Sequence, residues 1–239
     1  MMLLFDHDFI RDDDRHAVVT GRRFDHLRRI IRPALGDTVT VELIAMTRAS
    51  PRGPLRRPTV IELEVHYEGP PPAALPVTLL MALPRPKSLF KIVQHATTLG
   101  VKALHFYNSS RVDKSFWQSR RLQPEALHND IWLGLEQARD TVEPQIVMHR
   151  LFAPFINDVL PDLIAHKACY LAHPDSDHGA PCPRQGSGQP TVVALGPERG
   201  LIPYEVDQFR ALGFEHVHLG PRILTLEQAM LVTLGRMFG

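Results

Sequence analysis

Two short loops bracketed by glycine offer the most suggestive backbone for contacting a small molecule. Leu195–Gly200 follows the apolar run Thr191–Leu195, and Leu219–Leu224 follows the run Phe214–Leu219. Glycine lets a backbone approach a ligand closely, and open α/β sheets bind ligands beyond the carboxyl ends of their strands. Taken alone, each loop is more often an ordinary turn between a strand and a helix. The two loops are therefore candidates for a ligand site whose assignment needs further motifs.

Other kinds of site find less support in the sequence. Neither the dinucleotide pattern G-x-G-x-x-G nor the phosphate loop G-x-x-x-x-G-K-[ST] occurs. Four possible metal ligands share a Gly/Pro-rich stretch without the spacing of a tetrahedral site, so we predict no metal: His173, Asp175, Asp177 and His178. Cys169 and Cys182 form no C-x-x-C pair, which argues against a disulfide scaffold and fits a reducing cytosol.

A compact basic segment near the start of the chain is the candidate for binding RNA. We expect a short helix over Gly21 to Ile31, with Phe24, Leu27 and Ile30/Ile31 on one face. Around it lie the predicted phosphate contacts Arg22, Arg23, His26, Arg28, Arg29 and Arg32. The alternative is a solvated surface face, which is the usual fate of a charge run.

The elements that must position these residues divide the chain in two. Thr38–Met46 and Thr59–Tyr67 are typical of strands in a small barrel or sandwich, and the Pro/Arg-rich stretch Arg48–Pro58 between them is expected to be mobile. Gly69–Pro72 resembles a linker, so we predict domains over 1–72 and 73–239. From Val77 onward strands alternate with helices, which predicts a mostly parallel α/β sheet.

Three details of the second domain are specific enough to test. Gly100 stands where a helix ends, and Thr225 to Gln228 form a capping box that begins the last helix. His173 to Pro190 is expected to be one long loop.

Composition sets outer limits on function. The 239 residues are 44% hydrophobic and carry a net charge of only +1, so any RNA binding must come from a local patch. No apolar run is long enough to span a membrane, and the apolar stretch Met1–Phe5 at the start of the chain is too short for a secretory segment. We expect a soluble cytoplasmic protein.

The chain contains several longer motifs in a fixed order. Near the C-terminus lie VALGPERGLIPYEVDQF and LGPRILTLEQA, and upstream lie RRFDHLRRIIR, KSLFKIVQHATTLGV, the Glu136-Gln137 pair and LAHP at Leu171–Pro174. In this order they resemble the motifs of the bacterial small-subunit (16S) rRNA uracil-N3 methyltransferases, a family of the SPOUT class, and the two C-terminal motifs carry the closest resemblance. Nearly the whole chain is therefore similar to this family.

This resemblance implies a fold, a cofactor and an assembly. It implies an N-terminal PUA-like β-barrel, a C-terminal domain with a trefoil knot, a homodimer, and S-adenosyl-L-methionine as cofactor. By motif match, the implied cofactor contacts are His173, Leu195, Gly196, Pro197, Gly200, Leu219, Gly220, Ile223, Leu224, Thr225 and Ala229.

The chain departs from the family pattern at two positions. Arg199 stands where the family usually has glycine, and Thr225 replaces a second arginine. Arg199 in this loop would narrow the pocket, oppose the cofactor's positive charge or point at RNA phosphate. We therefore keep two hypotheses: an active methyltransferase, and a non-catalytic RNA-binding relative whose cofactor loop is altered at Arg199 and Thr225.

The chemistry follows from the implied substrate. Uracil N3 becomes nucleophilic when its proton leaves, so the site needs a base or a cation that stabilises the anion. We assign Arg222 to orienting the base or stabilising its charge, and Glu198 to local positioning. Glu227 is a third catalytic candidate, although the dipole of the last helix alone would favour a carboxylate there. None of the three is identified as the general base.

Overall fold

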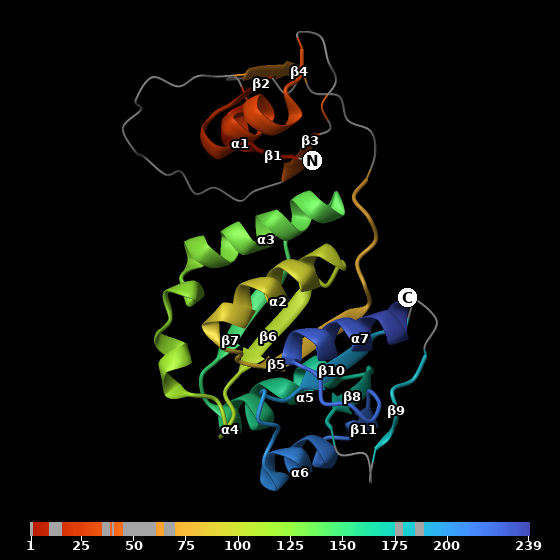
Figure 1. Ribbon diagram of the computed structural model, residues 1–239. Coiled ribbons are helices and arrows are strands. Elements are labelled where there is room, and N and C mark those ends of the chain that lie inside the picture. Colours follow the sequence, from red (N-terminus) through yellow and green to blue (C-terminus); the bar gives the residue numbers. More distant parts are fainter. Residues whose placement is uncertain are drawn as a thin grey trace. The chain divides into compact units, whose positions relative to one another are not determined.

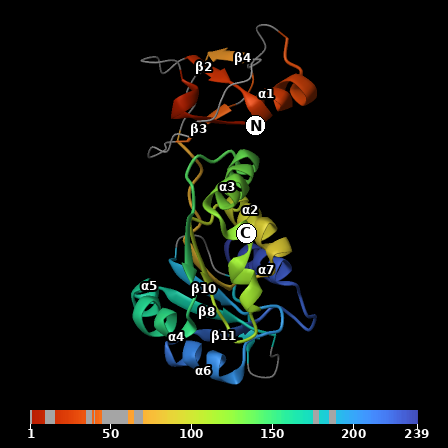
Figure 2. The same ribbon diagram turned by 90° about the vertical axis from the view of Figure 1, so that its left-hand side faces the viewer.

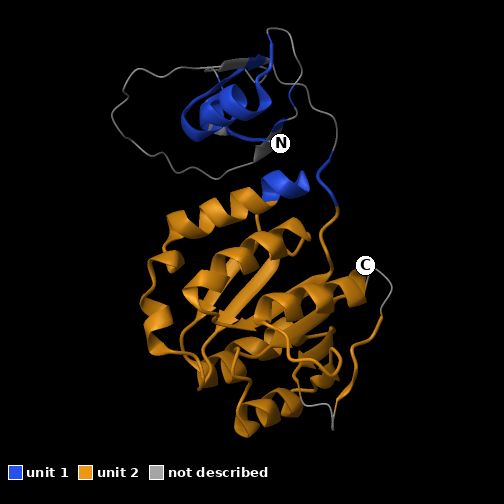
Figure 3. Cartoon of the chain, in the orientation of Figure 1, with its two compact units in different colours: residues 1–72, 135–142 blue, residues 73–134, 143–239 orange. Residues whose placement is uncertain are grey.

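The structure is a computed structural model that describes residues 2–9, 16–34, 39, 41–44, 61–64, 70–174, 179–184 and 189–239. Contacts divide the chain into two compact units, coloured separately in Figure 3. The first contains residues 1–72 with 135–142, and the second contains residues 73–134 with 143–239. The expected mobile stretch Arg48–Pro58 and the linker residue Gly69 lie outside the described residues.

The first unit contains two strand pairs and a short helix. Strand β1 (Met2–Phe5) runs parallel to β3 (Val41–Ile44), and β2 (His16–Val19) runs antiparallel to β4 (Ile61–Glu64). A short 3-10 turn, Asp6–Asp8, follows β1. The buried side chains that form its small core are Met2, Leu4, Ala17, Val19 and Leu27.

The basic helix has a different winding from the one expected. Helix α1 (Gly21–His26) continues as a π-helical turn over Leu27–Ile31, and the turn ends at Arg32 in the left-handed region (φ 51°). Phe24 and Leu27 are buried as predicted, but Ile30 and Ile31 are 70% and 40% exposed, so their predicted place on the apolar face is wrong. The wider π turn advances each residue by a smaller angle and carries these two positions off the core-facing stripe.

The second unit is built on a parallel sheet of seven strands among its described residues, and it confirms the predicted α/β class. The strands in spatial order are β7 (Gln145–His149), β6 (Ala103–Tyr107), β5 (Val77–Ala82), β10 (Thr191–Leu195), β8 (Ala168–Ala172), β11 (Glu215–His218) and β9 (Ala180–Pro181). All six pairings are parallel. β5 and β10, which lie side by side, are fully buried, as expected for central strands with both faces covered.

Helices cover both faces of this sheet (Figure 2). On one face lie α2 (Pro86–Thr98) and α7 (Leu226–Phe238), which contact each other. On the other lie α4 (Phe152–Pro154), the π turn Phe155–Val159, α5 (Leu160–Ile164) and α6 (Pro203–Ala211). There the Tyr107 ring stacks on Phe155 and meets Phe209 edge to face. The remaining elements are the 3-10 turns Lys114–Gln118 and Arg120–Leu122, followed by α3 (Pro124–Ala138).

Two predicted helix ends are confirmed, and one predicted loop needs correction. Gly100 follows α2 with φ +84°, a conformation that favours glycine. Thr225 caps α7, accepting the Gln228 N–H at 3.3 Å while the Gln228 side chain accepts the Thr225 N–H at 3.0 Å. The stretch 173–190, expected to be all loop, contains β9, which adds to the edge of the sheet because its backbone pairs with β11. No helix in the described residues is long and apolar enough to cross a membrane.

Candidate active site

The two glycine-bracketed loops meet at one cavity in the second unit. It opens at the carboxyl ends of β8, β10 and β11 and reaches the start of α7. Figure 1 labels these strands and the helix. The cavity encloses about 630 Å³ of empty space, open solvent at its mouth included. Its lining residues are Ala172, His173, Pro174, Leu195, Gly196, Pro197, Glu198, Gly200, Leu219, Gly220, Arg222, Ile223, Leu224, Leu226 and Ala229.

Ten of the eleven residues matched to cofactor contacts line this cavity, and Thr225 does not. Thr225 instead caps α7, with its hydroxyl bonded to the helix backbone. The reason for the convergence is topological: β10 and β11 both flank β8, so the loops leaving their carboxyl ends share one edge of the sheet.

The glycines of the first loop shape its backbone. A Cβ at Gly196 would lie 2.8 Å from Leu201 Cγ, so packing inside the loop already excludes a side chain there. Gly200 has φ +73°, and its N–H donates to the Pro197 carbonyl at 2.7 Å, which closes a tight turn. These two glycines are therefore required by the loop itself, independently of any ligand.

The second loop is more open. Gly220 has φ +118°, a glycine-favouring value, and its N–H donates to His218 Nδ1 at 3.2 Å. A Cβ at Gly220 would meet nothing within 4 Å. Ile223 lines the cavity yet is 87% exposed, so an apolar side chain stands uncovered at the cavity mouth.

The three proposed catalytic side chains differ in how they are held. Glu198 lines the cavity and forms an ion pair with Arg85, with Oε2 and Nε 2.6 Å apart. Arg222 also lines the cavity and is exposed. Glu227 begins α7 beside Leu226, and its Oε1 atom is buried with no hydrogen-bond partner among the described residues. The cavity lining thus contains one anchored carboxylate, Glu198, and one exposed cation, Arg222, whereas Glu227 is not among the lining residues.

His173 sits where β8 leaves the sheet and packs against a second histidine. Its ring lies 5.5 Å from the His216 ring in an edge-to-face arrangement, and its carbonyl lies 3.3 Å from His216 Nε2. Nε2 of His173 would be 3.8 Å from a Cβ at Gly200. The imidazole therefore borders the first loop from the β8 side.

Four residues that hold the first loop and its surroundings were not predicted from the sequence. Arg85 holds Glu198, and Arg111 Nη1 donates to the Arg199 carbonyl. The buried Tyr107 hydroxyl donates to the Leu195 carbonyl at 2.9 Å, and burial, followed by the Glu205 charge, raises the pKa of this phenol well above its ordinary value. The signal available in the sequence was position: Tyr107, Arg85 and Arg111 lie at or just after the carboxyl ends of β5 and β6.

Glu205 is the fourth of these residues and is almost completely buried. Its carboxylate accepts hydrogen bonds from Ser109 Oγ at 3.0 Å, from the Ser110 N–H at 2.7 Å and from the Ile202 N–H at 3.1 Å. It thereby ties the loop after β6 to the first turn of α6. Three donors on one carboxylate offset the cost of burying the charge.

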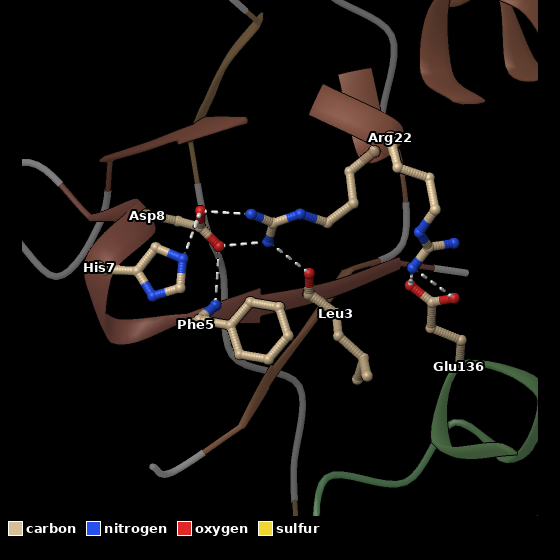
Figure 4. Close-up of polar contacts among 7 residues, drawn as sticks. Leu3, Phe5, His7, Asp8, Arg22 and Glu136 are labelled. Atoms are coloured by element: carbon tan, nitrogen blue, oxygen red, sulfur yellow. Dashed lines mark hydrogen bonds and ion pairs between the residues drawn. The ribbon is translucent and has the colours of Figure 1, made fainter. Parts of the chain in front are cut away.

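Some arginines of the basic helix are exposed to solvent, whereas others bind groups of the first unit itself. Arg23 bonds both Asp8 carboxylate oxygens and the Leu3 carbonyl, so this side chain supports the unit's own fold. Arg22 lies 3.2 Å from Glu136 Oε1 within the same unit (Figure 4). The remaining predicted contacts are exposed: His26, Arg28, Arg29 and Arg32.

Within the described residues no three His, Cys, Asp or Glu side chains are grouped to hold a metal ion. Asp175, Asp177 and His178 lie outside those residues. Cys169 and Cys182 are free thiols, and burial raises the pKa of each.

The chain matches one family model and several curated relatives. A model described as an RNA methyltransferase domain matches residues 71–238. A relative named ribosomal RNA small subunit methyltransferase E, from Treponema pallidum, is 28% identical over 223 residues, covering 89% of this chain and 82% of the relative. A protein of the same name from Mycobacterium bovis is 24% identical over 248 residues, covering 98% and 90%.

Solved structures share the fold over almost the whole chain. A probable rRNA-methyltransferase from Porphyromonas gingivalis has a TM-score of 0.64 at 19% identity, covering 98% of this chain and 95% of its own. A ribosomal RNA small subunit methyltransferase E from Neisseria gonorrhoeae, bound to S-adenosyl methionine, has a TM-score of 0.62 at 17% identity, covering 98% and 94%.

Proposed function

Because the chain belongs to the RNA methyltransferase family, whose model matches residues 71–238, we propose that it methylates N3 of a uridine in 16S ribosomal RNA, with S-adenosyl-L-methionine as donor. The observation that carries this proposal is the single cavity shared by the loops after β8, β10 and β11, at the edge of the sheet where such folds bind ligands. The named relatives support the substrate, and two solved relatives described with the bound cofactor support the donor.

The cavity lining suits this donor chemically. Apolar side chains, among them Leu195, Leu224 and Ala229, offer walls for an adenine ring, and the loop backbones offer N–H and C=O groups to its edge. Glu198, held by Arg85, would add a carboxylate to the wall of a site that takes a cationic donor. When bound, S-adenosyl-L-methionine supplies an electrophilic methyl group.

The chain's own residues prepare the acceptor. Uracil N3 lies on the base-pairing edge, so the target must enter the site unpaired or flipped out. Arg222 lines the cavity and is exposed, and we assign its guanidinium to stabilising the charge of the deprotonated base. Arg85 holds Glu198 in one orientation, and Glu227 has a buried oxygen available as an acceptor.

The same proposal includes the domain type, the knot and the homodimer that the family resemblance implies. We assign the first unit to a PUA-like domain that binds RNA through Arg22, His26, Arg28, Arg29 and Arg32, and we assign a trefoil knot to the second. A homodimer is supported by apolar side chains left exposed beside the cavity and on α7, namely Ile223 and Leu231. A ribosomal RNA substrate would place the protein in the cytoplasm.

Calorimetry and nucleoside analysis together test the function. S-adenosyl-L-methionine is titrated into the wild-type protein and the Arg199→Gly variant, and unmodified 16S RNA and small subunits are then assayed for N3-methyluridine by mass spectrometry. We expect micromolar binding by both proteins and methylation of one of the two substrates. No binding by the wild type, restored in Arg199→Gly, would favour the non-catalytic relative. Binding without methyl transfer to either substrate would overturn the assigned acceptor.

A further inference from the structure

Arg199, the residue that departs from the family pattern, lies outside the cofactor cavity. Its neighbours Glu198 and Gly200 line the cavity, but Arg199 is absent from the lining and is exposed. Its carbonyl accepts a hydrogen bond from Arg111 Nη1. Gly200 lies between two side chains, because a Cβ there would be 3.7 Å from Arg111 Nη1 and 3.8 Å from His173 Nε2. The loop is therefore bonded by Arg111 on one side and bordered by His173 on the other, while the Arg199 side chain is exposed.

Three arginines from neighbouring strands gather beside this loop. Arg85 follows β5, Arg111 follows β6 and Arg199 follows β10, and these strands are adjacent in the order β6-β5-β10 (Figure 1). All three residues are exposed. Because parallel strands end at the same edge of a sheet, their cationic side chains collect on one side of the cavity.

Nearby carboxylates neutralise this charge only in part. Glu198 pairs with Arg85 at 2.6 Å. Asp113 accepts the Ser115 N–H at 2.8 Å, and the pKa of its carboxyl is lowered first by this bond, then by the Ser115 side chain and less by the charge of Arg199. Arg111 commits one terminal nitrogen to the Arg199 carbonyl, which leaves other donors of its five N–H groups facing solvent.

We propose that Arg111 and Arg199 form a phosphate-binding rim that contacts the RNA strand flanking the target nucleotide. This inference rests on the proposed function, since a base that enters the cavity brings its neighbouring phosphates to the mouth. Guanidinium groups match phosphate oxygens in a bidentate geometry. The rim gives the second unit an RNA contact of its own, separate from the basic helix of the first unit.

The test measures RNA affinity against salt concentration. A fluorescent single-stranded 12-mer of uridylate is titrated with the full-length protein by anisotropy between 50 and 300 mM salt. Wild type is compared with Arg199→Gln, Arg199→Lys and Arg111→Lys, and Arg236→Gln serves as the control because it lies near the far end of α7. Calorimetry with S-adenosyl-L-methionine is run on each variant.

A phosphate contact predicts a defined pattern. Arg199→Gln should bind the RNA about three- to tenfold more weakly at 100 mM salt and reduce the slope of log affinity against log salt by about 0.7. Arg199→Lys should restore the slope, because it keeps the charge. Arg111→Lys should weaken RNA binding without changing the slope, since lysine keeps the charge but loses the bidentate fork. Cofactor affinity of Arg199→Gln should stay within about twofold of wild type, because this side chain does not line the cavity.

Two results would overturn the proposal that Arg111 and Arg199 bind RNA phosphates. One is an unchanged slope and affinity for Arg199→Gln while the cofactor binds normally, which leaves the proposed function intact. The other is a wild type that binds the 12-mer no more tightly at 50 mM salt than at 300 mM. Failure of the proposed function itself would appear differently, as absence of cofactor binding in the wild type and in every variant.

Discussion

The Glu198 carboxylate at the cavity and the Arg85 guanidinium at the start of α2 lie 2.6 Å apart, so two loops from adjacent strands are joined by one ion pair. Arg85 belongs to the connection after β5, and Glu198 belongs to the connection after β10. The pair links the entrance of a helix that packs on the sheet to a wall of the proposed cofactor site.

Breaking this ion pair should affect the site more than the fold. The Arg85 side chain is 61% exposed and that of Glu198 27%, and such pairs typically add about 0–1 kcal/mol to the free energy of unfolding. Arg85→Ala should therefore leave the melting temperature within about 3 °C of wild type while weakening cofactor binding about three- to tenfold, as measured by calorimetry. Arg85→Lys should recover part of the affinity, and Lys87→Ala, two residues along, should match wild type. Equal losses in both alanine variants would contradict a specific role for the pair.

Arg222 should act on methyl transfer rather than on cofactor binding. If it stabilises the charge of the deprotonated base, Arg222→Ala should lower kcat about 100-fold with the cofactor Kd changed by less than about threefold. Arg222→Lys should retain an intermediate rate, since it keeps the charge without the planar fork. Single-turnover methylation and calorimetry measure the two quantities separately. A cofactor Kd that weakens as much as kcat falls would instead assign Arg222 to the donor.

Glu205 should prove the most costly of these side chains to remove. Glu205→Ala leaves two backbone N–H groups and the Ser109 hydroxyl without their acceptor, which should lower the free energy of unfolding by about 3 kcal/mol. Glu205→Gln keeps the shape and should cost about half as much. Urea denaturation followed by circular dichroism gives both values, with Glu215→Ala, on an exposed position of β11, as the control. A loss below about 1 kcal/mol for the alanine variant would show that water replaces the carboxylate.

Features formed by consecutive residues could be predicted from the sequence, whereas contacts between residues far apart in the chain could not. The loops after β10 and β11, and the cap at Thr225, are continuous in sequence and were predicted as the structure has them. Arg85 and Arg111 were not, because their proximity to β10 depends on strand order. β10 follows β5 by more than 100 residues along the chain and yet lies beside it in the sheet.

Local departures escaped prediction for a different reason. No hydrophobic period marks the π turn that exposes Ile30 or the two-residue strand β9, and β9 is defined by its pairing with β11. The buried Glu205 shows the same limit. In sequence it resembles an ordinary acidic residue in the first turn of a helix, and its three donors become visible only once the loop after β6 is placed.

The stability of the second unit should fall in mild acid because of a buried histidine. Burial, followed by the charges of His149 and Lys167, lowers the pKa of His105 to about 4, and its Nδ1 lies 2.9 Å from His149 Nε2. Below pH 6.5 the unfolded chain takes up a proton that the folded histidine does not accept until about pH 4. The free energy of unfolding should therefore decrease between these values, by at most about 3 kcal/mol.

Urea denaturation at pH 7.5, 6 and 5 measures this loss. His105→Gln and His105→Leu remove the titrating group, so both should show a shallower decrease than wild type, whatever their stability at pH 7.5. A slope identical to wild type in both variants would assign the acid sensitivity to another group.

Substituting Glu227 should affect the stability of the protein and the rate of methyl transfer in opposite directions. Its Oε1 atom is buried without a hydrogen-bond partner among the described residues, so in the free protein this charge is poorly compensated, apart from the dipole of α7. Glu227→Gln removes the charge but keeps the shape, and the melting temperature should therefore stay level or rise by about 1–3 °C.

Methyl transfer should respond in the opposite direction. A carboxylate that accepts a hydrogen bond or a proton from the substrate becomes useful only once substrate is bound, so Glu227→Gln should lower kcat about 10- to 100-fold with cofactor affinity unchanged. Glu125→Gln is the matched control, because Glu125 occupies the first turn of α3 and is exposed. A variant that loses stability but keeps its rate would show that Glu227 serves the helix, whereas a stable, slow enzyme would place its carboxylate on the reacting base.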